Sequence, residues 1–122
     1  ALVEQAPPSQ QGELRHFLYK DHQSKKAVIY ESEAPKAFPV SLSYRLLQEQ
    51  SSGYLLEIQP HTGKYHQIRA QLAFIGCPIV GDARYGAQRP FREKAIALHA
   101  SRLLFRNPQT GEEVAVEAVA AF

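Results

Sequence analysis

The stretch that decides the fold runs from Thr62 to Gly86 and reads TGKYHQIRAQLAFIGCPIVGDARYG. Within it, apolar and aromatic side chains recur at i, i+3, i+7 and i+10, at Tyr65, Ile68, Leu72 and Ile75. This spacing places them on one face of an α-helix of about three turns. The glycine at Gly76 and the proline two residues later are typical of a helix end. The sequence therefore predicts one principal helix over residues 65–75, with that face packed on a sheet.

Extended segments are predicted on both sides of this helix. Residues 40–46 alternate apolar and polar side chains, and residues 54–58 follow a Ser-Ser-Gly turn, so the two are expected to form a hairpin. Short strand-like runs lie at residues 1–4, 27–30 and 114–118, and a long one at residues 96–105. Residues 12–20 instead favour one or two helical turns, because Leu14, Phe17 and Leu18 follow an i, i+3, i+4 pattern. The expected fold is α+β, a mixed and mostly antiparallel sheet with one principal helix, in a single unit over residues 1–122.

Composition excludes several classes of protein. The apolar stretches are too short to span a bilayer, and no signal peptide is visible. The single cysteine, Cys77, rules out an internal disulfide framework and suits a reducing compartment, so we expect a cytoplasmic protein. The chain lacks methionine and opens at Ala1 directly in a strand-like run. We therefore expect it to have been cut from a larger protein.

Charge is unevenly distributed along the chain. Residues 61–106 hold eight lysines and arginines against two acids, a net of +6, whereas the other 76 residues hold six against ten, a net of −4. Such asymmetry indicates an anion-binding surface, with nucleic acid first among the candidates. The alternative is a solvated face of mixed charge.

Polar functional groups are densest between His61 and Arg69. Gly63 would let the backbone turn sharply and a ligand come close, and Lys64 adds charge beside the unpaired N–H groups of the helix start. Together they predict a phosphate site. His66 and Arg69 share a helix face, and a buried arginine needs a carboxylate or phosphate partner. The alternative is an ordinary strand-turn-helix joint with polar residues at its surface.

Two other kinds of site are weaker interpretations of the same residues. The ligands of a zinc site would be His61, His66, Cys77 and His99. His61 and His66 lie on either side of the predicted helix start, so their side chains are not expected to meet at one metal ion. A Cys77–His66 nucleophile pair is disfavoured because the cysteine lies in an apolar Gly-Cys-Pro-Ile setting. We expect no metal and no membrane.

The same stretch resembles the signature of the RluA-type RNA pseudouridine synthases, in which Thr-Gly-Arg-x-His-Gln-Ile-Arg precedes Pro-Ile-x-Gly-Asp-x-x-Tyr-Gly. The matching positions are Thr62, Gly63, His66, Gln67, Ile68, Arg69, Leu72, Gly76, Pro78, Ile79, Gly81, Asp82, Tyr85 and Gly86. Residues 41–47, 98–108 and 118–122 also resemble stretches of that family. The resemblance covers essentially the whole chain and implies part of a pseudouridine synthase catalytic fold.

The chain departs from the family pattern in three places. Lys64 stands where the family usually has arginine, and Gln71 replaces a common histidine. The family's catalytic aspartate follows His-Arg-Leu, whereas the aspartates of this chain, Asp21 and Asp82, do not follow Arg-Leu. Residues 1–4 look like the segment just after the family's active-site tyrosine. The resemblance therefore implies the C-terminal half of a catalytic domain whose N-terminal half, with the catalytic aspartate, is absent, so that this chain alone would be inactive.

The resemblance also implies what the residues do. The family isomerises uridine to pseudouridine in ribosomal or transfer RNA, without a cofactor, on a base flipped from its stack. Arg69 matches the arginine that pairs with the catalytic aspartate, and with that partner absent we expect its head group to be exposed or bridged to an anion. Leu98 looks like part of the apolar wall beside the base. The RNA-binding residues implied are Thr62, Gly63, Lys64, His66, Gln67, Leu98, Arg84, Arg89 and Arg92. Two alternatives stay open: a non-catalytic RNA-binding module, and a small α+β protein that binds a phosphate-bearing ligand.

Overall fold

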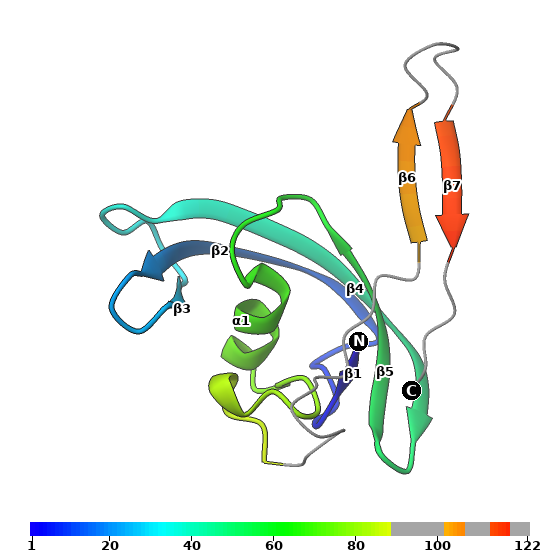
Figure 1. The fold of residues 1–122 in the computed structure, drawn as a ribbon. Helices are drawn as coiled ribbons and strands as arrows, with labels where there is room; N and C mark the ends of the chain where they lie inside the picture. The colour runs from blue at the N-terminus through cyan, green and yellow to red at the C-terminus, as the bar shows by residue number, and fades with distance from the viewer. Residues whose placement is uncertain (89–101, 107–112, 118–122) are drawn as a thin grey trace.

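The computed structural model describes residues 1–88, 102–106 and 113–117. Its elements are, in chain order, β1 (Leu2–Val3), β2 (Gln11–Asp21), β3 (Lys26–Tyr30), β4 (Phe38–Gln50), β5 (Gly53–Pro60), α1 (Gln67–Phe74), the 3-10 helix η1 (Ala83–Tyr85), β6 (Arg102–Arg106) and β7 (Glu113–Glu117). Five strands form one curved sheet in the order β1-β5-β4-β2-β3, with every neighbouring pair antiparallel, and α1 lies against one of its faces (Figure 1). The predicted α+β fold is confirmed.

Alternation along β4 explains why the sheet has one covered face. Val40, Leu42 and Tyr44 are buried, whereas Ser43 and Arg45 between and beyond them point to the other face. The predicted hairpin is confirmed, because β4 pairs with β5 across a turn at residues 51–52. In a strand whose apolar and polar side chains alternate, the apolar ones all lie on one face of the sheet, and burial of that face removes them from water.

The prediction of helical turns at residues 12–20 is wrong, because these residues belong to the long strand β2. Leu14 and Leu18 are buried, and their spacing of four residues fits both a helix and one face of a strand. Phe17, which made the pattern look helical, is only half-buried. Pairing with β4 and with β3 satisfies the backbone hydrogen-bonding groups of this segment. The periodicity of the sequence could not show those partner strands.

The principal helix is confirmed, although it begins two residues later and ends one residue earlier than predicted. Of the predicted apolar face, Leu72 is fully buried, and Ile68 and Ile75 pack against the same core. Tyr65 lies before the helix and is exposed, so its predicted place on that face is wrong. The small side chain of Ala70 is buried in a second cluster that includes residues of β2, β3 and β4.

The end of α1 follows the prediction. Gly76 has a positive φ of 84°, which glycine adopts at little cost. Its N–H donates to the carbonyl of Ala73 at 3.0 Å, and the N–H of Cys77 donates to the carbonyl of Leu72 at 2.9 Å. This pair of bonds is the Schellman motif, which satisfies carbonyls that the last turn leaves free.

The other predicted strands are found wherever the structure describes them. Residues 2–3 pair with β5, residues 26–30 form β3, and β6 pairs with β7. Residues 96–101 and residue 118 of the predicted strands lie outside the described residues. Among the described helices, none is long and apolar enough to cross a membrane.

Candidate functional site

The sharp turn into α1 is made by His66 and not by Gly63. His66 has a φ of 53° in the left-handed region, while Gly63 is absent from the residues with positive φ. The expectation that glycine makes this turn is therefore wrong. A side chain added at Gly63 would meet no atom within 4 Å, so this residue leaves open space beside the helix start.

The buried side chain of Gln67 holds the loop before the helix. Its Oε1 accepts from the Thr62 hydroxyl at 2.7 Å and from the Lys64 N–H at 3.1 Å. Its Nε2 donates to the Ser41 carbonyl on β4 at 2.9 Å, and the Ser41 N–H donates to Thr62 Oγ1 at 3.2 Å. Thr62 and Gln67 thus have a structural role that the sequence did not reveal, and their contact with RNA stays a prediction.

Arg69 forms a two-point ion pair with Asp82. Its Nε donates to Asp82 Oδ2 at 3.0 Å, and its Nη2 donates to Oδ1 at 2.8 Å. The Asp82 side chain is 1% exposed and that of Arg69 21% exposed. Hydrogen bonding to this carboxylate raises the pKa of Arg69.

The expectation that Arg69 would be exposed or bridged to a free anion is therefore wrong. A guanidinium keeps its proton at accessible pH, so inside the fold it takes a carboxylate within reach. The chain after α1 returns through the Gly81-Asp82 turn and brings that carboxylate beside the helix. Asp82, to which the sequence assigned only a place in the family signature, is the arginine's partner.

His66 continues this network on the other side of the arginine. Its Nε2 lies 3.2 Å from Arg69 Nη1, and its Nδ1 lies 2.7 Å from the Tyr85 hydroxyl. Because the guanidinium can only donate, Nε2 must accept, which assigns the ring proton to Nδ1. The Tyr85 oxygen then accepts from Nδ1 and from the Ala27 N–H at 3.0 Å. The network thus links α1, η1 and β3.

Protonation of His66 conflicts with this arrangement. A proton on Nε2 would face the donor N–H of Arg69. The pKa of His66 lies below its usual value, chiefly because of burial and then because of the positive charges of Arg69 and Arg84. Tyr65 stacks on the same ring at a centroid distance of 3.8 Å. These contacts favour the neutral form of His66, with its ring proton on Nδ1.

A hollow of about 290 Å³ opens at the start of α1. Its lining residues are Pro60, Thr62, Gly63, Lys64, His66, Gln67, Ile68 and Arg69. The structure therefore brings together all the predicted site residues of the helix start. Arg84 has another contact, since its Nη2 donates at 2.6 Å to the carbonyls of Ser24 and Lys25. Arg89, Arg92 and Leu98 lie outside the described residues.

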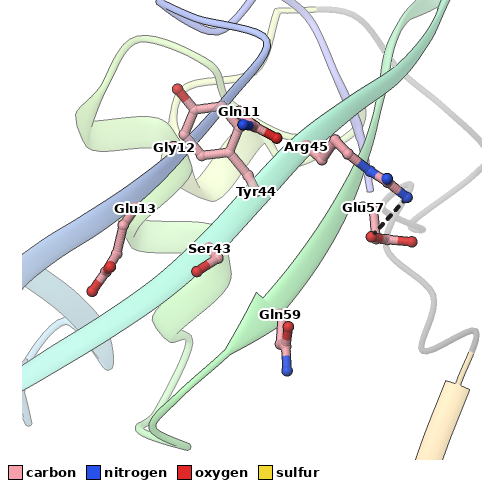
Figure 2. Close-up of a pocket in the computed structure, with 8 residues that line it drawn as sticks. All are labelled: Gln11, Gly12, Glu13, Ser43, Tyr44, Arg45, Glu57 and Gln59. Atoms are coloured by element: carbon pink, nitrogen blue, oxygen red, sulfur yellow. Dashed lines mark ion pairs between the residues drawn. The ribbon is translucent and has the colours of Figure 1, made fainter.

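A second and larger hollow, of about 530 Å³, lies on the opposite face of the sheet (Figure 2). It is lined by Gln11, Gly12, Glu13, Ser43, Tyr44, Arg45, Glu57 and Gln59. Figure 2 shows side chains of this face pointing away from the helix, with an ion pair between Arg45 and Glu57. None of its lining residues belongs to the 62–86 stretch. The smaller hollow is the candidate site because it is lined by Arg69, whose partner Asp82 is buried, and by His66.

The weaker interpretations find no support in the described part of the chain. No three histidine, cysteine or acidic side chains there are grouped as metal ligands. His61 contacts the Ser43 hydroxyl at 2.7 Å, away from His66 and Cys77, while His99 lies outside the described residues. Burial raises the pKa of the Cys77 thiol, which disfavours the nucleophilic thiolate.

Comparisons with known proteins agree with the fold and the signature. A family model for RNA pseudouridylate synthase matches residues 1–74. The uncharacterized RNA pseudouridine synthase YlyB of Bacillus subtilis is 40% identical over 75 residues, which are 62% of this chain and 25% of the relative. The tRNA pseudouridine synthase C of Salmonella typhi is 39% identical over 71 residues, 52% of this chain and 27% of that protein.

A solved structure gives the same fold. The human RNA Pseudouridylate Synthase Domain Containing 1 superposes with a TM-score of 0.77 at 24% identity, over 98% of this chain and 52% of that one. The fold is thus that of a pseudouridylate synthase domain. The chain belongs to the RNA pseudouridylate synthase family and is of the RluA type. It spans about a quarter of the two curated relatives named above.

Proposed function

We propose that the protein carrying this chain isomerises uridine to pseudouridine in RNA, ribosomal or transfer, in the cytoplasm. The chain would be the C-terminal half of the catalytic domain and would supply the arginine wall of the active site, while the catalytic aspartate would come from elsewhere in the protein. The observation that carries this proposal is Arg69, which lines the hollow while Asp82 holds its guanidinium by two hydrogen bonds.

The donors of Arg69 explain how one arginine serves two carboxylates. Asp82 takes the Nε hydrogen and one Nη2 hydrogen, and His66 takes one Nη1 hydrogen. A guanidinium has five N–H groups, so one remains on each terminal nitrogen. Those two donors suit a second carboxylate, which would be kept ionised and oriented by the positive charge. Asp82 and His66 thus fix the plane in which the catalytic aspartate is bound.

The hollow has the character that a flipped base requires. Its volume of about 290 Å³ and its lining by Pro60 and Ile68 suit a small planar ring. The base must leave the stack so that its glycosidic bond can be broken and remade to carbon. The isomerisation is redox-neutral, and the proposal requires neither a metal nor an organic cofactor.

The test compares two arginines in the complete protein that carries this chain. Arg69→Lys keeps the charge but loses the planar two-point contact, so we expect turnover to fall about 100-fold or more, as when a preorganised transition-state donor is removed. RNA affinity should change far less. Arg45→Lys on the opposite face is the matched control and should leave turnover unchanged. The readout is tritium release from transcripts labelled at C5 of uridine.

Three outcomes would contradict parts of this proposal. Near-normal turnover by the Arg69→Lys protein would remove the arginine from the active site. Turnover by residues 1–122 alone would show that catalysis does not need an aspartate from another part of the protein. It would point to another nucleophile such as Asp82. RNA affinity with no turnover by the complete wild-type protein would identify a non-catalytic RNA-binding module instead.

A further inference from the structure

The hairpin between β2 and β3 carries a basic segment that the sequence did not connect with the site. Lys20, Lys25 and Lys26 lie within a part of the chain whose net charge is negative. In the structure, the Tyr65 hydroxyl donates to the Lys25 carbonyl at 3.0 Å. Arg84 donates to the same carbonyl and to that of Ser24. Side chains from both ends of the 62–86 stretch therefore hold this hairpin beside the start of α1.

The lysine ammonium groups of the hairpin lie near the rings of the site. Lys20 Nζ is 4.2 Å from the centroid of the Tyr65 ring, and Lys26 Nζ is 5.2 Å from that of Tyr85. The same two rings contact the imidazole of His66. Cation–π contacts of this kind restrain a flexible side chain without neutralising it. The two charges are thus placed next to the network that holds Arg69.

These charges have no carboxylate partner within the described part of the chain. The ion pairs found there are Arg15–Glu13, Arg45–Glu57 and Arg69–Asp82. Asp21 lies opposite Lys26 in the strand register, but its carboxylate accepts from the backbone N–H of Gln23 at 3.0 Å. Like charges gathered on one surface repel one another, and a polyanion relieves that repulsion.

We propose that this surface binds the phosphates of the RNA strand on either side of the nucleotide that enters the hollow. The hairpin surface is defined as Lys20, Lys25, Lys26, Lys64 and Arg84. Lys64 also lines the hollow, so a strand whose base enters it passes over the hairpin surface. This inference rests on the proposed function and adds to it the route of the RNA backbone.

The experiment measures the salt dependence of RNA affinity in the complete protein. Lys20→Gln with Lys26→Gln removes two charges, and Lys25, which turns the backbone with a φ of 54°, is left unchanged. Each phosphate contact contributes about 0.7 to 0.9 to the slope of log affinity against log salt. We expect the slope to become shallower by about 1.5, measured by fluorescence anisotropy with a substrate transcript.

Two control proteins make the result specific. Arg15→Gln with Arg45→Gln removes the same charge from the opposite face and should leave the slope within error of the wild type. Lys20→Arg with Lys26→Arg keeps the charge and should restore the wild-type slope. Circular dichroism and urea unfolding confirm that each protein is folded.

Each remaining outcome overturns the proposal in a distinguishable way. If the wild type binds and isomerises RNA but the glutamine pair keeps its slope, the hairpin surface is wrong and the proposed function stands. If the glutamine pair and the opposite-face pair lower the slope equally, the effect is one of net charge, and the surface is again wrong. If the wild type neither binds nor isomerises RNA, both proposals fail.

Discussion

The two faces of the sheet each have an arginine–carboxylate pair nearby, and the two pairs differ in kind. On the covered side, Arg69 and Asp82 share two hydrogen bonds, with side chains 21% and 1% exposed. On the open face, Arg45 and Glu57 approach to 3.3 Å, and both are 58% exposed. Water screens the exposed pair, whereas the buried carboxylate depends on its partner for its stability. Residue types alone do not distinguish these pairs, but burial does.

The two hollows differ in the same way as the two ion pairs. The larger lies on the open face among exposed polar side chains (Figure 2). The smaller lies at the helix start beside the buried network. Volume is a poor guide here, because a ligand site needs a few polar groups held in fixed directions. The network at the helix start provides such groups.

The largest difference in stability between the two faces of the sheet should come from leucine substitutions. Leu72 of α1 is fully buried, so Leu72→Ala should lower the free energy of unfolding by about 3 kcal/mol through lost burial and the cavity left behind. Leu47 in the bulge of β4 is 49% exposed, and Leu47→Ala should cost about 0.5 kcal/mol or less. Urea unfolding of the complete protein measures both. Equal costs would mean that α1 does not cover this face.

The two ion pairs should differ nearly as much. Asp82→Asn leaves a largely buried guanidinium without its charge partner, at a cost of about 2 to 3 kcal/mol, somewhat below the cost for a fully buried pair because Arg69 is partly exposed. Glu57→Gln should change the free energy of unfolding by less than about 0.5 kcal/mol. The same unfolding experiment at low and high salt provides the comparison. A large, salt-sensitive cost at Glu57 would reverse the assignment of the two faces.

Smaller effects distinguish the two glycines that flank α1. Gly76 has a positive φ and caps the helix, so Gly76→Ala should cost about 1 kcal/mol. Gly63 has open space around it and no positive φ, and Gly63→Ala should change stability by a few tenths of a kcal/mol at most. A methyl group at Gly63 would nevertheless project beside the hollow, so RNA turnover is the more sensitive readout there. A Gly63 variant that unfolds more readily than the Gly76 variant would contradict these backbone assignments.

The smallest effect concerns pH. The pKa of His66 is lowered in the folded protein, so the unfolded state binds the proton first, at its ordinary pKa of about 6.5. The stability contributed by neutral His66 is complete above that pH and is lost as pH falls towards the folded pKa. Because His66 is only partly buried, solvent screening limits this loss to a few tenths of a kcal/mol.

Replacing the imidazole isolates this contribution. His66→Gln should flatten the fall in unfolding free energy between pH about 7 and about 5. Burial also lowers the pKa of His16, which accepts from Gln71 Nε2 at 3.0 Å, so part of the pH dependence remains in the His66→Gln protein. An unchanged pH profile in that protein would show that the imidazole is not held neutral by the network.

Local spacing in the sequence determined the principal helix, its glycine end, the β4–β5 hairpin and the resemblance to the pseudouridine synthases. These features depend on residues within about one or two turns or along one strand, where side-chain period and backbone preference act directly. The same local rule failed at β2, because a spacing of four between Leu14 and Leu18 fits two structures. Only pairing with β3 and β4 decides between them.

The tertiary structure alone decided the partners of the polar residues. The bond between Arg69 and Asp82 joins positions 13 apart, that between Gln67 and Ser41 positions 26 apart, and that between Arg84 and Lys25 positions 59 apart. Such contacts depend on how the chain closes on itself, and a charged or amide side chain takes whichever complementary group the closed fold brings within reach. The sequence named Arg69 as a candidate site residue, but the fold gave it Asp82 and placed Lys20 and Lys26 of the β2–β3 hairpin over the rings of Tyr65 and Tyr85.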